Sequence, residues 1–179
     1  VVAIGCGSGG GDAGSEPGDD DDDTGTTAGN TLPVYDTPIQ ICINEVMTDN
    51  TGALEVDGDW PDWIELHNPT ATTQSLDGWL VHDESGSAFR LDASASIPAS
   101  GFLLLYASEL DLPGHLPFKL NNSGDSVSLV RPDESFIQVN VPESVADYAF
   151  ARETDCCAGD CWTAQLWGTP GETNVVPEE

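Results

Sequence analysis

Positive charge is what this sequence has least of. Its 179 residues include 4 Lys and Arg against 32 Asp and Glu, which gives a formal net charge of −28. Proteins bind nucleic acid by neutralising phosphates with Lys and Arg, and the same side chains draw proteins to anionic membrane surfaces. We therefore expect no nucleic-acid partner, whereas high solubility and a basic or cationic partner fit this charge.

Helical periodicity and catalytic motifs are also missing. No stretch repeats its apolar residues at helical spacing for long, and no G-x-S-x-G pattern of a serine nucleophile is found. The cysteines lack the second pair or the His spacing of a zinc site. Two carboxylates for glycoside hydrolysis cannot be singled out among 32 acids. We therefore predict a protein that is not an enzyme and that carries no cofactor.

The first 38 residues differ in composition from the rest of the chain. They hold 9 of the 19 Gly, the run Asp19–Asp23 and no Lys or Arg. Few apolar groups and one sign of charge cannot offset the entropy of ordering, so we expect residues 7–38 to be a disordered acidic linker.

Residues 1–6 resemble the end of a bacterial lipoprotein signal peptide. In Ala3-Ile4-Gly5-Cys6 a small residue precedes a Cys and a Gly/Ser tract follows, although Ala3 stands where the lipobox usually has Leu. The resemblance implies lipidation of Cys6 and an outer-membrane or surface lipoprotein of the bacterial cell envelope, with the lipid anchor as its only membrane contact. The alternative is a disordered tail with an incidental Cys.

Short alternating segments dominate the chain from residue 39 onward. Most are four to eight residues long and are bounded by Gly, Pro, Asn or Asp, which is typical of strands in a β-sandwich. Glu45 falls on the apolar face if the alternation is strict, so we expect a bulge or strand end near Asn44. We predict an all-β sandwich of about 8–9 short strands over 39–174 and a C-terminal tail at 175–179. The expected strands are 39–43, 63–67, 76–83, 88–91, 102–106, 126–130, 136–141 and 148–151.

Several motifs appear in the order found in one known family. Asn44-Glu45-Val46 is followed by Asp62-Trp63-Ile64-Glu65-Leu66-His67-Asn68 and then by Leu76-Asp77-Gly78-Trp79. Together with the motifs around 118–129 and 167–174, this order resembles the lamin-tail domain. The resemblance implies an immunoglobulin-like β-sandwich, and such domains occur both in nuclear lamins and in secreted bacterial proteins. The cysteine-bearing loop at 155–161 departs from the family pattern.

Two candidate sites lie around residue 60. Trp60 and Trp63, with Glu65 and His67, would form an aromatic platform for a glycan or a peptide if both indoles were exposed. The alternative is that Trp63 packs against the fold. Asp57, Asp59 and Asp62 are Ca²⁺ candidates, but they do not complete a Ca²⁺ ligand set, so we predict no firm metal site.

The five cysteines provide a test of cellular compartment. If Cys6 carries lipid, then Cys42, Cys156, Cys157 and Cys161 can all pair in an oxidising envelope. Neighbouring cysteines rarely bond to each other, so one of Cys156 and Cys157 would pair with Cys161 and the other with Cys42. The sequence does not decide which. The alternative is that Cys42 is a buried free thiol and that one loop bridge forms.

These observations favour a monomeric binding or adhesion module, displayed on the cell envelope, with a protein or a cell-surface glycan as its partner. The alternative is an accessory domain of a secreted or Ca²⁺-dependent hydrolase whose catalytic part is not in this chain.

Overall fold

The computed structural model describes residues 40–175, and in this range the chain folds into twelve β-strands with no helix. Consequently, the described part has no helix long and apolar enough to cross a membrane. Cys6, the linker at 7–38 and residues 176–179 of the predicted tail lie outside the described range. The strands are β1 (Cys42–Met47), β2 (Asp62–His67), β3 (Gln74–Ser75), β4 (Leu80–His82), β5 (Ala88–Arg90), β6 (Ser96–Ile97), β7 (Phe102–Ala107), β8 (His115–Leu116), β9 (Asp125–Val130), β10 (Phe136–Val141), β11 (Tyr148–Arg152) and β12 (Trp162–Leu166).

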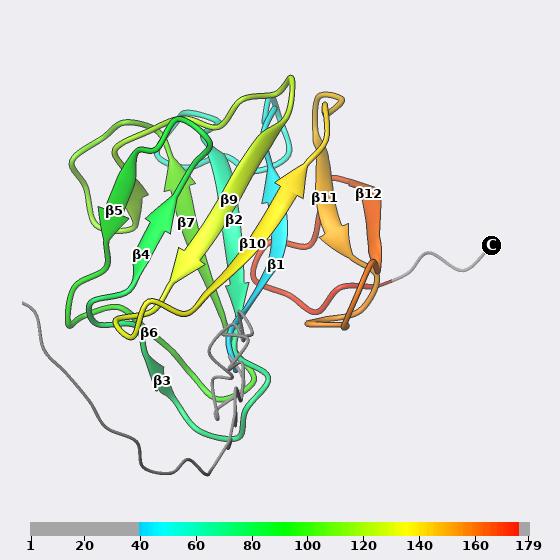
Figure 1. Ribbon diagram of the computed structural model, residues 1–179. Coiled ribbons are helices and arrows are strands. Elements are labelled where there is room, and N and C mark those ends of the chain that lie inside the picture. The colour runs from blue at the N-terminus through cyan, green and yellow to red at the C-terminus, as the bar shows by residue number, and fades with distance from the viewer. Residues whose placement is uncertain (1–39, 176–179) are drawn as a thin grey trace, which may run out of the picture. The chain divides into compact units, whose positions relative to one another are not determined.

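Two sheets face each other as a sandwich (Figure 1). The larger has the order β12-β11-β1-β2-β7-β8, and the smaller has the order β10-β9-β4-β5. A two-stranded sheet joins β3 to β6. All neighbouring strands are antiparallel except β7 and β8. The predicted all-β, immunoglobulin-like sandwich is confirmed.

The main core lies between the two sheets. Ile43, Val46, Ile64 and Leu66 come from the larger sheet, and Val81, Val127 and Leu129 from the smaller one; all are buried in one cluster. Their alternation with outward side chains is the period-two pattern of strands with one buried face.

The expected irregularity at Asn44 is a β-bulge. The pairing of β1 with β2 shifts between Ile43 and Glu45, so one extra residue stands on β1. Ile43 and Val46 therefore both reach the main core, while Glu45 faces the opposite side of the sheet with Met47. The bulge thus places a carboxylate on the outer face of the larger sheet.

A second, smaller apolar cluster lies on that outer face. Met47, Trp63 and Ala149 are buried there, and Leu54, Leu104 and Tyr106 pack against them. The continuous apolar run at 102–106 therefore supplies side chains to both faces of the sheet. Strand β7 is an interior strand of this sheet, between β2 and the two-residue edge strand β8.

Four strands were not predicted from the sequence: β3, β6, β8 and β12. Three of them have two residues each, too few to show a period. The prediction that the last strand ends near residue 151 is wrong, because β12 follows the cysteine loop and pairs with β11 from Trp162 to Leu166.

Candidate functional site

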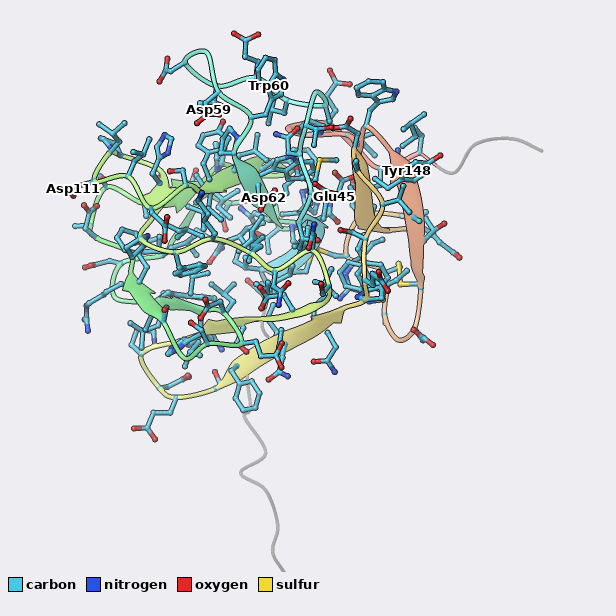
Figure 2. All side chains as sticks on the ribbon, turned by 90° about the horizontal axis from the view of Figure 1, so that it is seen from above. Glu45, Asp59, Trp60, Asp62, Asp111 and Tyr148 are labelled. Carbon is cyan, nitrogen blue, oxygen red and sulfur yellow. A yellow bond between two sulfur atoms is a disulfide. The ribbon has the colours of Figure 1, made fainter. Side chains whose placement is uncertain are left out.

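The loop that carries the Ca²⁺ candidates is held by its own hydrogen bonds. The backbones of Val56 and Asp59 bond to each other across a turn, at 2.8 and 3.1 Å. Asp59 accepts a bond from the Trp60 amide at 2.9 Å, and Asp62 accepts one from the Asn50 amide at 3.0 Å. Figure 2 shows Asp59 and Trp60 at the loop tip and Asp62 deeper in the molecule. Within residues 40–175, no group of three His, Cys, Asp or Glu side chains is placed to hold a metal ion.

The structure does not bring Trp60 and Trp63 together as an exposed platform. Trp60 is 41% exposed, whereas Trp63 is fully buried beneath the loop and packs with Met47 and Ala149. His67 is also buried, where its Nδ1 lies 3.0 Å from the Gly101 carbonyl oxygen and its ring lies against Phe102. The packing alternative for Trp63 is therefore the one that the structure supports.

Glu65, the remaining member of that expected site, belongs to a buried polar cluster. It lies opposite Glu45 on β1, and neither side chain is exposed. Glu65 accepts hydrogen bonds from the Asn44 amide at 3.0 Å and from the Gly171 backbone at 2.6 Å. Glu45 accepts bonds from the Thr169 backbone and hydroxyl.

Burial dominates the ionisation of this pair. Loss of solvent raises the pKa of Glu65 to about 8, despite the hydrogen bonds that favour its charged form. The pKa of Glu45 is raised for the same reason, and the nearby Asp155 adds to both shifts by like-charge repulsion. Neither carboxyl group is exposed to solvent in this fold. Apart from Asn44, their partners are backbone and side-chain groups of residues 167–174, which we call the C-terminal strap.

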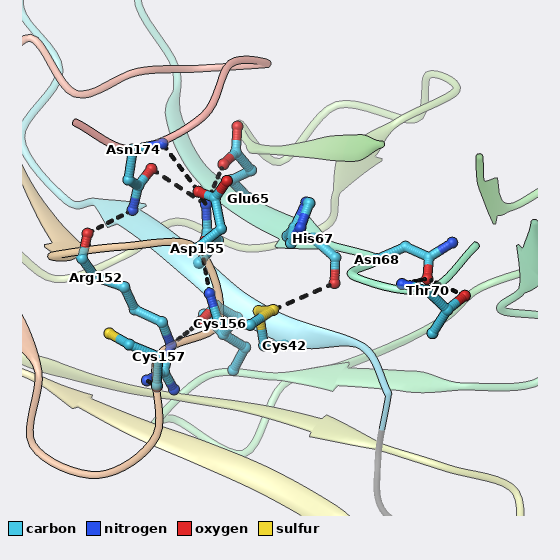
Figure 3. The surroundings of a disulfide bond; sticks show 12 residues. Cys42, Glu65, His67, Asn68, Thr70, Arg152, Asp155, Cys156, Cys157 and Asn174 are labelled. Atoms are coloured by element: carbon cyan, nitrogen blue, oxygen red, sulfur yellow. Dashed lines mark hydrogen bonds between the residues drawn. A yellow bond between two sulfur atoms is a disulfide. The ribbon is translucent and has the colours of Figure 1, made fainter. Parts of the chain in front are cut away.

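The bulged Asn44 ties this cluster to the cysteine loop, and Figure 3 shows Asp155 of that loop beside Asn174. The Asn44 amide also donates to Asp155 at 3.1 Å and to Asn174 at 3.2 Å. Asn174 in turn donates to the backbone oxygen of Arg152 at 2.6 Å. Three segments far apart in sequence therefore meet at one side chain, which indicates a structural role for the cluster.

Two disulfides hold the same region. Cys42 bonds to Cys156 across 114 residues, and Cys157 bonds to Cys161. The predicted scheme of one long bridge and one loop bridge is confirmed, and the partner of Cys42, which the sequence left open, is Cys156. The long bridge attaches the cysteine loop to β1.

A shallow hollow of about 550 Å³, wide open to solvent, lies on the outer face of the smaller sheet. The strand register sets three rows across it: Phe136 beside Val130, Gln138 beside Ser128, and Asn140 beside Ser126. Phe136 is 60% exposed. Ser128 donates to Gln138 at 3.3 Å, and Gln138 donates to Asn140 at 3.0 Å.

The rim of this hollow is acidic. His82 extends the middle row from β4, and Asp83 and Glu84 follow it along the chain. No Lys or Arg lines the hollow. None of the residues that line the hollow was among the candidate site residues predicted from the sequence, although alternation along the expected strand at 136–141 puts Phe136, Gln138 and Asn140 together on one face.

Comparison with known proteins agrees with the fold. The Lamin Tail Domain family model matches residues 36–142. No curated protein matches the chain. The match covers more than half of the sequence and spans β1 to β10, with its Asn44 bulge and the Glu45–Glu65 pair. The chain belongs to the lamin tail domain family.

Proposed function

We propose that this domain is a non-catalytic binding module of the cell envelope and that the outer face of its smaller sheet binds a neutral glycan. The observation that carries the proposal is the exposed ring of Phe136 beside Gln138, Asn140 and Ser128 on a hollowed sheet face. An aromatic ring that is 60% exposed beside oriented polar groups offers a ligand an apolar contact and hydrogen bonds at the same place.

The chemistry of the hollow suits a sugar. A pyranose ring has an apolar face that packs on an aromatic ring and hydroxyls that both donate and accept hydrogen bonds. The hydrogen bonds among Ser128, Gln138 and Asn140 orient these groups before a ligand arrives, which lowers the entropy cost of binding. Asp83 and Glu84 at the rim disfavour an anionic ligand.

The two disulfides support an extracytoplasmic location, because such bonds persist in oxidising compartments. We further propose that the module is a monomer on a lipid-anchored tether at the bacterial surface, with Cys6 of the lipobox-like Ala3–Cys6 as the lipidated residue. In cells that make the protein with its own leader, Cys6→Ala should release it from the membrane fraction. Unchanged fractionation would contradict the anchor and leave the glycan proposal standing.

A glycan array probed with the full chain tests the binding proposal. We expect neutral oligosaccharides among the ligands, and Phe136→Ala should weaken the best of them by at least about tenfold in a calorimetric titration. Leu166→Ala, which removes an exposed apolar side chain from the other sheet, is the matched control and should bind normally. An array without neutral ligands, or equal binding by the Phe136 variant, contradicts the proposal.

A further inference from the structure

The two sheets of the sandwich differ in width, and the difference leaves one hairpin without a facing strand. The larger sheet continues past β1 into β11 and β12, whereas the smaller sheet ends at β10. Figure 1 shows β11 and β12 extending beyond β10 at one side of the molecule. The face of this hairpin on the side of the smaller sheet is therefore covered only in part.

Apolar side chains occupy that face. Tyr148 pairs with Leu166, and Phe150 pairs with Ala164, so all four side chains lie on the same side of the hairpin. Leu166 is 47% exposed, and Val145, in the loop that enters β11, is 67% exposed. We call Val145, Tyr148, Phe150, Ala164 and Leu166 the hairpin patch.

A pocket of about 200 Å³ opens in the hairpin patch. Its walls are Tyr148, Phe150 and Ala164 on one side and the loop from Val141 to Val145 on the other. This volume suits one aliphatic side chain of a partner. In protein interfaces, a few side chains buried in such pockets supply most of the binding energy.

The charges around the pocket indicate which kind of segment would bind there. Glu143 lines the pocket, and none of the four Lys and Arg of the chain does. Arg152, the nearest of them along β11, is engaged elsewhere: it stacks on Trp162 and donates to the backbone oxygens of Ile43 and Cys157. A second copy of this chain would bring another net charge of −28, so self-association through this surface is disfavoured.

The neighbouring edge is open to an extended segment. β12 is the outermost strand of its sheet within the described range, and its sequence Trp-Thr-Ala-Gln-Leu contains neither charge nor proline. Charged side chains and prolines on an edge strand are common features that prevent other chains from pairing with it. An approaching extended chain therefore meets no repulsive group on β12 itself.

We infer that the hairpin patch docks an extended basic segment of a partner protein, which places one aliphatic side chain in the pocket and its flanking Lys or Arg against Glu143. This surface lies on a different sheet from Phe136, so the inference is independent of the glycan proposal. The segment gains affinity from apolar burial and specificity from charge.

A peptide series tests the inference on the full chain. The probe is a fluorescein-labelled nonapeptide, Lys-Ser-Lys-Ser-Leu-Ser-Lys-Ser-Lys, measured by anisotropy. A second peptide replaces its Leu with Ala, and a third replaces every Lys with Glu. We expect the Leu peptide to bind, the Ala peptide to bind about tenfold more weakly, and the Glu peptide not to bind.

Protein variants then locate the contact. Ala164→Leu fills the pocket from an exposed position and should weaken the Leu peptide about tenfold, and Glu143→Gln should weaken it and reduce its salt dependence. Phe136→Ala is the matched control and should bind the peptide normally. Equal binding of the Leu and Ala peptides, unchanged binding by Ala164→Leu, or no binding of the Leu peptide at about 1 mM would overturn the inference.

Discussion

Glu45 and Glu65 lie directly opposite each other on the neighbouring strands β1 and β2, and neither side chain reaches solvent. Two facing carboxylates would repel each other if both were charged. The fold accommodates them because burial raises the pKa of both groups and because the C-terminal strap donates hydrogen bonds to each. The pair therefore attaches the end of the domain to its first two strands.

This arrangement predicts that the domain becomes less stable as the pH rises from about 4.5 to 8. The folded state holds a proton on Glu65 that the unfolded state has lost, so the contribution is complete below the unfolded pKa and disappears as the pH passes the folded pKa of about 8. Asp62, whose pKa burial raises to about 6, acts with the same sign. Urea denaturation at several pH values, with the disulfides intact, measures the effect.

The matched variant for this prediction is Glu65→Gln, which cannot titrate. It should be less stable than the parent, because its NH₂ group would face one of the two N–H donors, Asn44 or Gly171, that now bond to Glu65. Its stability should also depend less on pH across the same window. Asp92 and Asp133 do not interfere, since hydrogen bonds from Ser94 and Ser135 lower their pKa values and move their effect to more acid solution. A free energy of unfolding that stays level or rises from pH 4.5 to 8 would show that the carboxyl pair is ionised.

The two disulfides should differ in what they contribute to stability. In the chain-entropy model, the bridge across 114 residues is worth about 5 kcal/mol and the bridge across 4 residues about 2 kcal/mol, before any native-state strain. The double variant Cys42→Ser/Cys156→Ser should therefore lose more stability in urea denaturation than Cys157→Ser/Cys161→Ser. The reverse order, or a Cys156–Cys157 linked peptide in non-reducing mass spectrometry of the parent, would refute the assignment.

Gly168 should tolerate no side chain. Its φ is +61°, and a Cβ atom there would lie 2.9 Å from the Glu45 carboxylate and 3.0 Å from both Trp63 and Ala149. Gly168→Ala should cost about 2–4 kcal/mol, since it combines left-handed strain with overpacking. Gly86→Ala is the control: its φ is +83°, but nothing lies within 4 Å of the added atom, so about 1–2 kcal/mol is expected. Equal losses in the two variants would mean that the strap moves away from the sheet easily.

The alternation of residues predicted much of the fold but little of the site. Ile64 and Leu66 identified one face of β2, and the misplaced Glu45 revealed the bulge at Asn44. The same pattern put Trp63, Glu65 and His67 on the other face, yet it could not show that the loop at 48–61 and the strap cover that face. Such cover depends on contacts between residues far apart in sequence, as in the bond from Gly171 to Glu65.

The cysteines and Phe136 illustrate two further limits. Counting cysteines gave the scheme of pairs, but choosing Cys156 over Cys157 required the position of the loop above β1. Phe136 sat in a correctly predicted strand, on the face opposite Ile137 and Val139. The Phe136 ring is exposed because no further layer covers the smaller sheet within residues 40–175. The sequence of the strand alone does not show whether such a layer is present.

The most direct test of the binding role is an NMR titration of the ¹⁵N-labelled full chain with the best neutral oligosaccharide from the array. We predict that the shifted amides cluster on β4, β9 and β10 around Phe136, Gln138 and Asn140, and that Phe136→Ala abolishes the shifts at the same ligand concentration. Shifts located elsewhere on the domain, or a spectrum that the oligosaccharide leaves unchanged, would contradict the proposal that this sheet face is the binding site.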